Sequence, residues 1–453
     1  MMEELLQLPG EWTLDDSGKR SSGVLFVDKS NRVVCLKVWF YGENQKSVEP
    51  FGIDFVLPIV SGRLMNGKHV TLSACVGMLM TVSSNIKEPR FSSEYQVNAK
   101  YAFINVNINA ESDLRFRGVL VDYGDIGEWA QESMVDYAFE FKGAYQWLLK
   151  RKTGAQFCVR DGVLVFVSAG VYGGRKNDMR AEVLIRQPTS VQFYYQAEES
   201  WDRIMDDVEI VRELITFGMN RHIEIRKTQT VHDSMLPPQM RGSQSFHASY
   251  CEEVYIGTKR KDLPFRVTAS DICLSLPDIL PLLGQSDGQG QKRLSLLRPV
   301  IKLFLEAHIY TDELHVEKVF LNLTRGLEAA HRSYDMISGG KGEYVAFWTR
   351  LKALLEPLCD IEGSGFSRAN LRDDIKSIVD SRNYYTHYDP ELYKIAIRDE
   401  QLAQLNRRMT KVLRYYILKL VGLSESVTKE RVGYGITPQC KVVAEEYAFG
   451  VGG

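Results

Sequence analysis

The sequence of 453 residues has no cysteine spacing that would indicate a disulfide framework or a zinc site. Its cysteines are odd in number and scattered, and no two of them form a CxxC pair. A structural zinc site needs closely spaced ligand pairs, and a disulfide framework normally uses an even number of cysteines in a short chain. We therefore expect reduced thiols that pack as small apolar side chains, with no metal and no cofactor. The cysteines are Cys35, Cys75, Cys158, Cys251, Cys273, Cys359 and Cys440.

The sequence also lacks an excess of charge and a long apolar run. A formal net charge of -2 provides no field that would attract a polyanion, so contact with nucleic acid would need a local patch or a catalytic site. No apolar run approaches the roughly 20 residues that cross a bilayer. Glu3 and Glu4 stand where a secretory signal peptide carries positive charge. These absences predict a cytoplasmic protein that has no membrane contact.

The first 275 residues contain short segments of alternating apolar and polar residues, bounded by Gly, Asn, Asp or Ser. Asp161-Gly162 separates two of them and predicts a tight hairpin, because glycine tolerates a positive φ. Many short strands predict an antiparallel sandwich or barrel. An amphipathic helix is expected from about 198 to Met219. The expected strands are 32–40, 69–76, 101–108, 117–124, 137–143, 221–227 and 251–258.

After residue 295 the apolar spacing becomes helical. The segment 282–295 is rich in Gly, Gln and Ser and is typical of a linker. Ser367 as N-cap and Pro390 as terminator would limit one helix to about 368–387. The sequence thus predicts an α+β multidomain protein. Its parts would be an N-terminal antiparallel β-rich domain (1–275), a linker (282–295), an all-α bundle of four or five helices (296–425) and a C-terminal tail (426–453). The apolar stripes of the bundle are Val316/Val319/Leu323/Leu327/Ala330, Phe347/Trp348/Leu351/Leu354/Leu355/Leu358, Leu371/Ile375/Ile378/Val379 and Leu402/Leu405/Met409/Val412/Tyr416/Leu420.

The segment IVDSRNYYTHYDPEL, residues 378–392, places an arginine on an apolar helical face. Arg382 follows three apolar residues by three, four and seven positions, so it shares their face. A lone buried charge costs several kcal/mol, so this arginine must be paired, lie in a cleft or face a partner. The three apolar residues are Val379, Ile378 and Ile375.

His387 stands five residues after Arg382, which is about 140° around a continuous helix. The two side chains would converge more easily if the helix ended or kinked near Thr386. Asp389-Pro390 favours such a break, because the residue before a proline avoids the helical conformation.

These residues resemble the HEPN superfamily of ribonuclease domains, whose hallmark is an arginine, often followed by asparagine, and a histidine a few residues later. Here Arg382 and Asn383 open the motif, and His387 closes it. With its β-rich N-terminal region and the segment LNLTRGLEAAHRSYD (321–335), the whole chain resembles the ApeA-type HEPN proteins of bacterial anti-phage abortive infection.

The resemblance implies a metal-independent endoribonuclease that acts as a homodimer through its bundle. Arg382 would hold the scissile phosphate, His387 would move protons, and Asn383 would orient one of them. The 2′-hydroxyl of RNA would be the nucleophile, so a metal is not required. The β domain would restrain the enzyme until a phage-derived trigger appears. The RNA cleaved, with transfer RNA as one candidate, and a higher oligomer are left open.

Further residues could line the same cleft or contact RNA, and each has a plainer interpretation. Glu328, His331 and Arg332 are candidates for the cleft or form a solvated helix face. Tyr384 and its neighbouring tyrosines could stack a base or pack in the core. Three residues four and three apart could bind phosphates or be ordinary surface. These three are Arg407, Lys411 and Arg414.

The motif residues themselves have an alternative interpretation. Arg382 could form a structural ion pair with Asp374 or Asp380, and His387 could be a histidine favoured at a helix C-terminus. The near balance of basic and acidic residues from 298 to 425 shows no broad RNA groove. The alternative function is therefore a non-catalytic HEPN protein that binds nucleotides or RNA, or dimerises.

Overall fold

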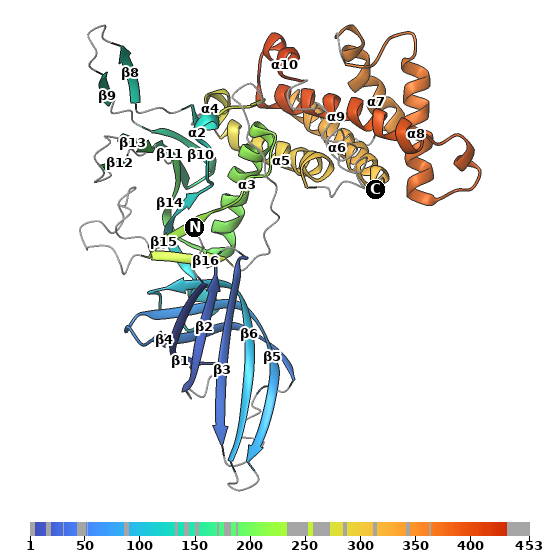
Figure 1. Ribbon diagram of the computed structural model, residues 1–453. Helices are drawn as coiled ribbons and strands as arrows, with labels where there is room; N and C mark the ends of the chain where they lie inside the picture. The colour runs from blue at the N-terminus through green and yellow to red at the C-terminus, as the bar shows by residue number, and fades with distance from the viewer. Residues whose placement is uncertain are drawn as a thin grey trace, which may run out of the picture.

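The protein is described by a computed structural model in which a β-rich part is followed by a helical part (Figure 1). The barrel of β1 to β6 lies at one end, α6 to α9 lie at the other, and α3 lies between them (Figure 1). The described residues are 5–14, 20–29, 31–42, 51, 53–85, 90–131, 135–139, 145–149, 154–169, 172–175, 183–186, 189–232, 252–256, 272–283, 288–310, 315–340, 345–361 and 364–432.

The first six strands close into an antiparallel barrel. Each strand pairs with two others in the ring β6-β3-β2-β1-β4-β5, and β5 pairs with β6 to close it. Buried and exposed positions alternate along the strands, so one face of each fills the interior. Closure leaves no free strand edge within the ring. The strands are β1 Leu5–Thr13, β2 Arg20–Asp28, β3 Val33–Gly42, β4 Asp54–Leu64, β5 His69–Asn85 and β6 Arg90–Ile104.

Trp12 fills the barrel interior because two glycines make room for it. It is fully buried and lies opposite Gly62 on the neighbouring strand. A Cβ at Gly62 would lie 2.3 Å from Trp12 Cε3, and one at Gly23 would lie 2.8 Å from Trp12 Cδ1. Both distances are shorter than any normal contact, so the indole requires glycine on both sides.

Beyond the barrel the same sheet continues as an open arm. The far end of β6 pairs with β16, and the order β16-β15-β7-β14-β11-β10 follows. The predicted Asp161-Gly162 hairpin is confirmed, since Gly162 has a φ of +75° between β10 and β11. Two separate hairpins pair β8 with β9 and β12 with β13. The remaining strands are β7 Arg115–Asp122, β8 Val135–Phe139, β9 Tyr145–Leu149, β10 Ala155–Arg160, β11 Val163–Ala169, β12 Tyr172–Arg175, β13 Val183–Arg186, β14 Thr189–Ser200, β15 Lys227–Val231 and β16 Glu252–Ile256.

The helical part contains every helix that the apolar stripes predict. α6 packs between α5 and α9, and α7 packs on α6 and α8. Its elements are α4 Leu276–Leu283, α5 Gln289–His308, α6 Val316–Ile337, α7 Phe347–Leu355, η6 Glu356–Asp360, α8 Leu371–His387, η7 Leu392–Lys394, α9 Asp399–Val421 and α10 Glu425–Arg431. The β-rich part adds η1 Glu111–Asp113, α2 Gly127–Ala130 and α3 Trp201–Met219, the last where the sequence predicts an amphipathic helix.

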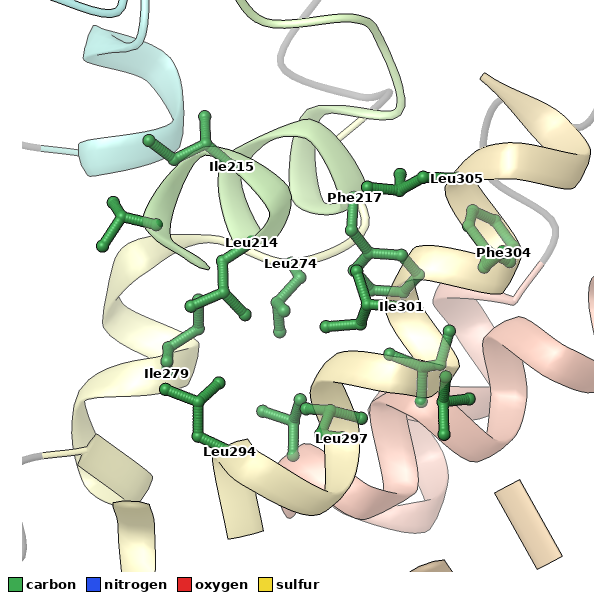
Figure 2. Close-up of a cluster of buried hydrophobic side chains, with 14 of the residues drawn as sticks. Leu214, Ile215, Phe217, Leu274, Ile279, Leu294, Leu297, Ile301, Phe304 and Leu305 are labelled. Atoms are coloured by element: carbon green, nitrogen blue, oxygen red, sulfur yellow. The ribbon is translucent and has the colours of Figure 1, made fainter. Parts of the chain in front are cut away.

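The two parts share one apolar core at the join between α3 and α5. Figure 2 shows Leu214 and Phe217 of α3 gathered with Leu297 and Ile301 of α5 in one buried cluster. The rings of Phe217 and Phe304 lie 5.1 Å apart, edge to face. The charged rim of this contact is an ion pair from Arg298 of α5 to Glu213 of α3. The helical part is therefore packed against the sheet-bearing part.

The expected linker at 282–295 is helical from Gln289 onward. Within its described residues, Gln289, Lys292 and Ser295 are exposed in the first turns of α5, where Leu294 is buried. Gly290 also lets α5 approach α4, because a Cβ there would lie 2.1 Å from the carbonyl oxygen of Leu282. Polar composition alone does not distinguish the solvated start of a helix from a flexible connection.

Other boundaries also differ from the expectation. The expected strand 221–227 is irregular up to residue 226, and β15 begins at Lys227. Ser367 does not cap α8: the N-cap is Asn370, which makes no side-chain capping bond. The expected tail contains α10, and residues 433–453 lie outside the described residues. Residues 140–143 of one expected strand, Cys251 and Cys440 also lie outside them.

Candidate active site at the end of helix α8

Helix α8 runs without a break through the Arg-Asn-Tyr-Tyr-Thr-His segment and ends at His387. Tyr388 terminates it with a left-handed backbone, φ 52°, and donates its N–H to the carbonyl of Tyr384 at 2.6 Å. The helix ends one residue after Thr386, close to where the sequence predicts that it ends or kinks, and it does so without a kink: the Thr386 hydroxyl donates to the Arg382 carbonyl at 2.7 Å inside a regular turn. On this continuous helix, Arg382 and His387 project about 140° apart.

Arg382 is held by one carboxylate and one aromatic ring of neighbouring helices. Its Nη2 lies 3.0 Å from Glu328 Oε1 of α6, and its guanidinium carbon lies 4.8 Å from the centroid of Phe347 at the start of α7. The Arg382 side chain keeps 32% exposure. Neither expected carboxylate is its partner in these contacts, since Asp374 binds Arg408 Nη2 at 2.7 Å. The guanidinium is therefore oriented and still reachable from solvent.

The apolar residues before Arg382 do not form an open stripe. Ile375 and Ile378 are 1% and 0% exposed, respectively, and pack inside the bundle of the same chain. Ile375 and Ile378 are therefore not available to pack against a second chain. Arg382 lies at the edge of the intramolecular core, beside the ring of Phe347.

Of the three expected cleft residues on α6, the structure brings Glu328 to Arg382. Arg332 is exposed, and His331 is partly buried. Burial, together with the nearby charge of Arg350, lowers the pKa of His331. Arg350 of α7 is almost fully buried and donates from Nη1 to the carbonyl of Glu328 at 3.3 Å and from Nε to the carbonyl of Val345 at 2.9 Å.

Arg350 is a site-supporting residue that the sequence analysis missed. It lies three residues after Phe347 and four before Leu354, so it interrupts an apolar stripe as Arg382 does. The same test of a cation on an apolar face would have found it. The hydrogen bond from Arg350 to the Glu328 carbonyl fixes the turn of α6 whose carboxylate binds Arg382.

His387 and Asn383 lie one helical turn apart and share a face of α8. His387 is exposed, and Asn383 is partly buried. Within the described residues neither side chain makes a hydrogen bond or an ion pair. Both side chains are therefore accessible to a bound molecule on this face of α8.

The segment 8–239 matches the family model described as ApeA N-terminal domain 1, and the segment 308–427 matches the model described as Apea-like HEPN. The chain belongs to the ApeA-type HEPN family. No curated protein and no solved structure matches it.

The two ApeA matches follow the architecture. The first spans the barrel and the open arm as far as β15, and the second extends from the end of α5 into α10. The Apea-like HEPN match includes Arg382 and His387. The segment between the matches carries β16, α4 and most of α5, which form part of the join described above.

Arg414 cannot contact RNA in this arrangement of the ApeA-type bundle. It is fully buried, donates from Nη2 to Asn220 Oδ1 at 2.6 Å and lies 5.4 Å from the centroid of Phe304. Its pKa is lowered by burial. Arg407 is exposed and Lys411 partly buried, so the expected three-residue phosphate stripe is broken. Around Arg414, α9 packs against α5 and against Asn220 at the end of α3.

The tyrosines of the motif divide between core and surface. Tyr385 is buried, donates its hydroxyl to the Ile397 carbonyl at 2.9 Å and has its pKa raised to about 12 by burial. Tyr384 is partly buried, and Tyr388 is 69% exposed. All three line a pocket of about 590 Å³ between the start of α6, the end of α8 and the start of α9.

Within the described ranges, no three His, Cys, Asp or Glu side chains are grouped as a metal site. Five cysteines there are free thiols. No helix in the described part of the chain is long and apolar enough to cross a membrane. The five cysteines are Cys35, Cys75, Cys158, Cys273 and Cys359.

Proposed function

We propose that this ApeA-type HEPN protein is an anti-phage endoribonuclease that cleaves RNA without a metal ion. The observation that carries the proposal is the end of α8. There an oriented, accessible guanidinium and an exposed imidazole occur five residues apart, within the Apea-like HEPN match. The proposed catalytic residues are Arg382, His387 and Asn383.

The proposed chemistry uses the nucleophile that RNA carries. The 2′-hydroxyl attacks the adjacent phosphorus while His387 accepts or donates a proton, and the 5′-oxygen of the next nucleotide leaves. Arg382 stabilises the charge on the phosphate oxygens, because its planar fork matches a phosphate. Glu328 binds one amino group of that fork at 3.0 Å. Its remaining N–H groups make no hydrogen bond to the described residues and are available to the phosphate.

The complete site would require two chains. Because Arg382 and His387 diverge by about 140° on one unbroken helix, a single α8 does not aim both at one phosphate. Two α8 helices related by a twofold axis would place the arginine of one chain near the histidine of the other. We therefore propose a cytoplasmic homodimer through the helical part, with the β-rich part restraining it until a phage-derived trigger binds.

A second candidate is a non-catalytic HEPN protein that binds nucleotides or RNA. The ion pair between Arg382 and Glu328 supports it, because a guanidinium already neutralised by a carboxylate suits a structural role. The two candidates differ in whether RNA is cut.

The deciding experiment is incubation of the purified protein with total RNA in EDTA, followed by chemical analysis of fragment ends. The proposal expects 2′,3′-cyclic phosphates and 5′-hydroxyls, and a 2′-deoxy substitution at the cut position should prevent cleavage. The His387→Ala protein serves as the inactive comparison, and His69→Ala in the barrel serves as the matched control. Fragments with 5′-phosphates, or cleavage that needs magnesium, would contradict the mechanism.

A further inference from the structure

The pocket beside the motif combines aromatic, cationic and amide side chains in one concave site. Its volume of about 590 Å³ is in the range of small-molecule pockets. Three elements contribute: the first turns of α6, the last turn of α8 and the first residue of α9. Its lining is His315, Glu317, Lys318, Leu321, Asn322, Arg325, Tyr384, Tyr385, Tyr388, Arg398 and Asp399.

The aromatic wall of the pocket is held in place and open on one side. Tyr384 is the centre of a cluster, with its ring centroid 5.9 Å from that of Tyr388 and 5.7 Å from that of Tyr393. Arg398 stacks over Tyr393 at 4.0 Å and so braces the loop that follows α8. Tyr388 remains 69% exposed beside the pocket, so its ring is accessible to another planar group.

The opposite wall favours an anion. Lys318 and Arg325 of α6 are exposed and form no ion pair with the described residues. The helices α6 and α9 both begin at this pocket, and the N-terminal ends of helices attract negative charge. Two acidic residues, Glu317 and Asp399, also line it and can accept hydrogen bonds from ribose hydroxyls or base amino groups.

We infer that this pocket binds one nucleotide unit, with its base against the ring of Tyr388 and its phosphate at Lys318 and Arg325. Sequence-tolerant stacking on aromatic rings, with basic groups tracking the phosphates, is how single-stranded RNA is held without base readout. Tyr384 lies three residues before His387 on α8, so the pocket adjoins the proposed cleavage site. The role of this pocket, which is to hold the substrate strand beside the cleaved bond, rests on the proposed ribonuclease function.

The test measures binding by full-length His387→Ala protein, which should not cut its probe. The probe is a fluorescein-labelled single-stranded RNA of about eight nucleotides and mixed sequence, read by fluorescence anisotropy. Tyr388→Asn removes the ring and keeps a residue that tolerates the left-handed backbone there. Arg325→Gln removes one cation. Each change should weaken binding about tenfold.

The control matched to Arg325→Gln is Arg372→Gln, which removes an exposed arginine in the first turn of α8, outside the pocket. It should leave affinity unchanged. Equal weakening by Arg325→Gln and Arg372→Gln, or unchanged affinity in Tyr388→Asn with an unaltered melting curve, would overturn the inference. Competition by free nucleoside 5′-monophosphates would identify an isolated nucleotide as ligand. Failure to compete, with Tyr388 dependence retained, would identify the RNA strand.

Tyr388→Asn and Arg325→Gln are also made in the protein that keeps His387, so that RNA binding and RNA cleavage can be measured on the same variants. These measurements separate the inference from the proposed function. Pocket-dependent binding of RNA that is never cut would support the pocket and contradict the ribonuclease. Cleavage at the parental rate by Tyr388→Asn, with parental affinity, would support the ribonuclease and contradict the pocket.

Discussion

The barrel and the helical part differ in the polar side chains that they bury. Within the described residues, the buried polar side chains of the barrel are uncharged serines and threonines, such as Thr71 and Ser73. The helical part and α3 bury charged groups, including Asp207, Arg350 and Arg414. A buried charge must be paired or hydrogen bonded. It therefore constrains the orientation of neighbouring polar groups, whereas an apolar side chain constrains only the space around it.

This difference suggests where function resides. The barrel interior depends on volume and alternation, and its buried side chains among the described residues carry no charge. The helical part uses directed bonds, and these same bonds orient Arg382 and the α6 turn around Glu328. We therefore expect acid to weaken mainly the helical part and overpacking to weaken mainly the barrel.

The largest expected effect is on activity. His387→Ala should reduce RNA cleavage by about 100-fold or more, the usual contribution of a general acid or base, and should abolish phage protection. Because His387 is exposed, the melting temperature should stay at the parental value. Cleavage rates and survival of phage-challenged cells at matched expression measure the effect. Full protection by the variant would remove His387 from the mechanism.

The next effect is on acid stability and should be confined to the helical part. Burial, with the nearby charge of Arg414, lowers the pKa of His308 to about 3. Folded His308 stays neutral while the unfolded chain binds a proton below about pH 6.5, so stability is complete above that pH and falls as pH drops toward 3. The loss should reach several kcal/mol over that interval.

Hydrogen exchange by mass spectrometry at pH 7 and pH 5 would test this prediction. Peptides of α5 and α9 should lose protection while barrel peptides keep theirs. His308→Phe, which retains a ring beside Phe304, should remove most of the acid loss. Equal loss of protection in β1 to β6 would show that the contrast between the two parts is wrong.

A smaller effect is expected in the barrel. Gly62→Val should destabilise the protein by about 2 kcal/mol, because its Cβ would overlap Trp12 and overpacking typically costs 1–3 kcal/mol. Gly67→Asn is the control, since Gly67 has a φ of +86°, which asparagine tolerates, and open space around it. Chemical unfolding at two pH values measures both variants. A Gly62→Val loss that depended on pH would contradict a packing-dominated barrel.

Local patterns in the sequence predict much of this fold. Alternation located strands such as β3, β7 and β16 but not β1, β2 or β4. The Asp161-Gly162 turn is a hairpin, and Pro390 marked the end of α8 correctly. What the sequence could not predict were contacts between residues far apart in the chain. Glu328 precedes its partner Arg382 by 54 positions in the sequence. The buried Arg414 donates a hydrogen bond to Asn220, which lies 194 positions before it. Periodicity gives the face of a helix, but not which neighbour covers it.

The smallest expected effect tests whether the directed bonds of the helical part serve stability or orientation. Glu328→Gln should change the free energy of unfolding by about 1 kcal/mol or less, because Arg382 and Glu328 are both partly exposed and such pairs contribute little. Cleavage should fall only several-fold, since the amide still accepts a hydrogen bond from the guanidinium but holds it less firmly. The control is Asp380→Asn, which changes a partly buried carboxylate on α8 and should match the parent in both measurements.

If Glu328→Gln destabilised the protein as much as Gly62→Val, the ion pair would be a structural element. The helical part would then resemble the barrel more than it differs from it. If the variant instead lost cleavage as completely as His387→Ala at parental stability, Glu328 would itself take part in the chemistry.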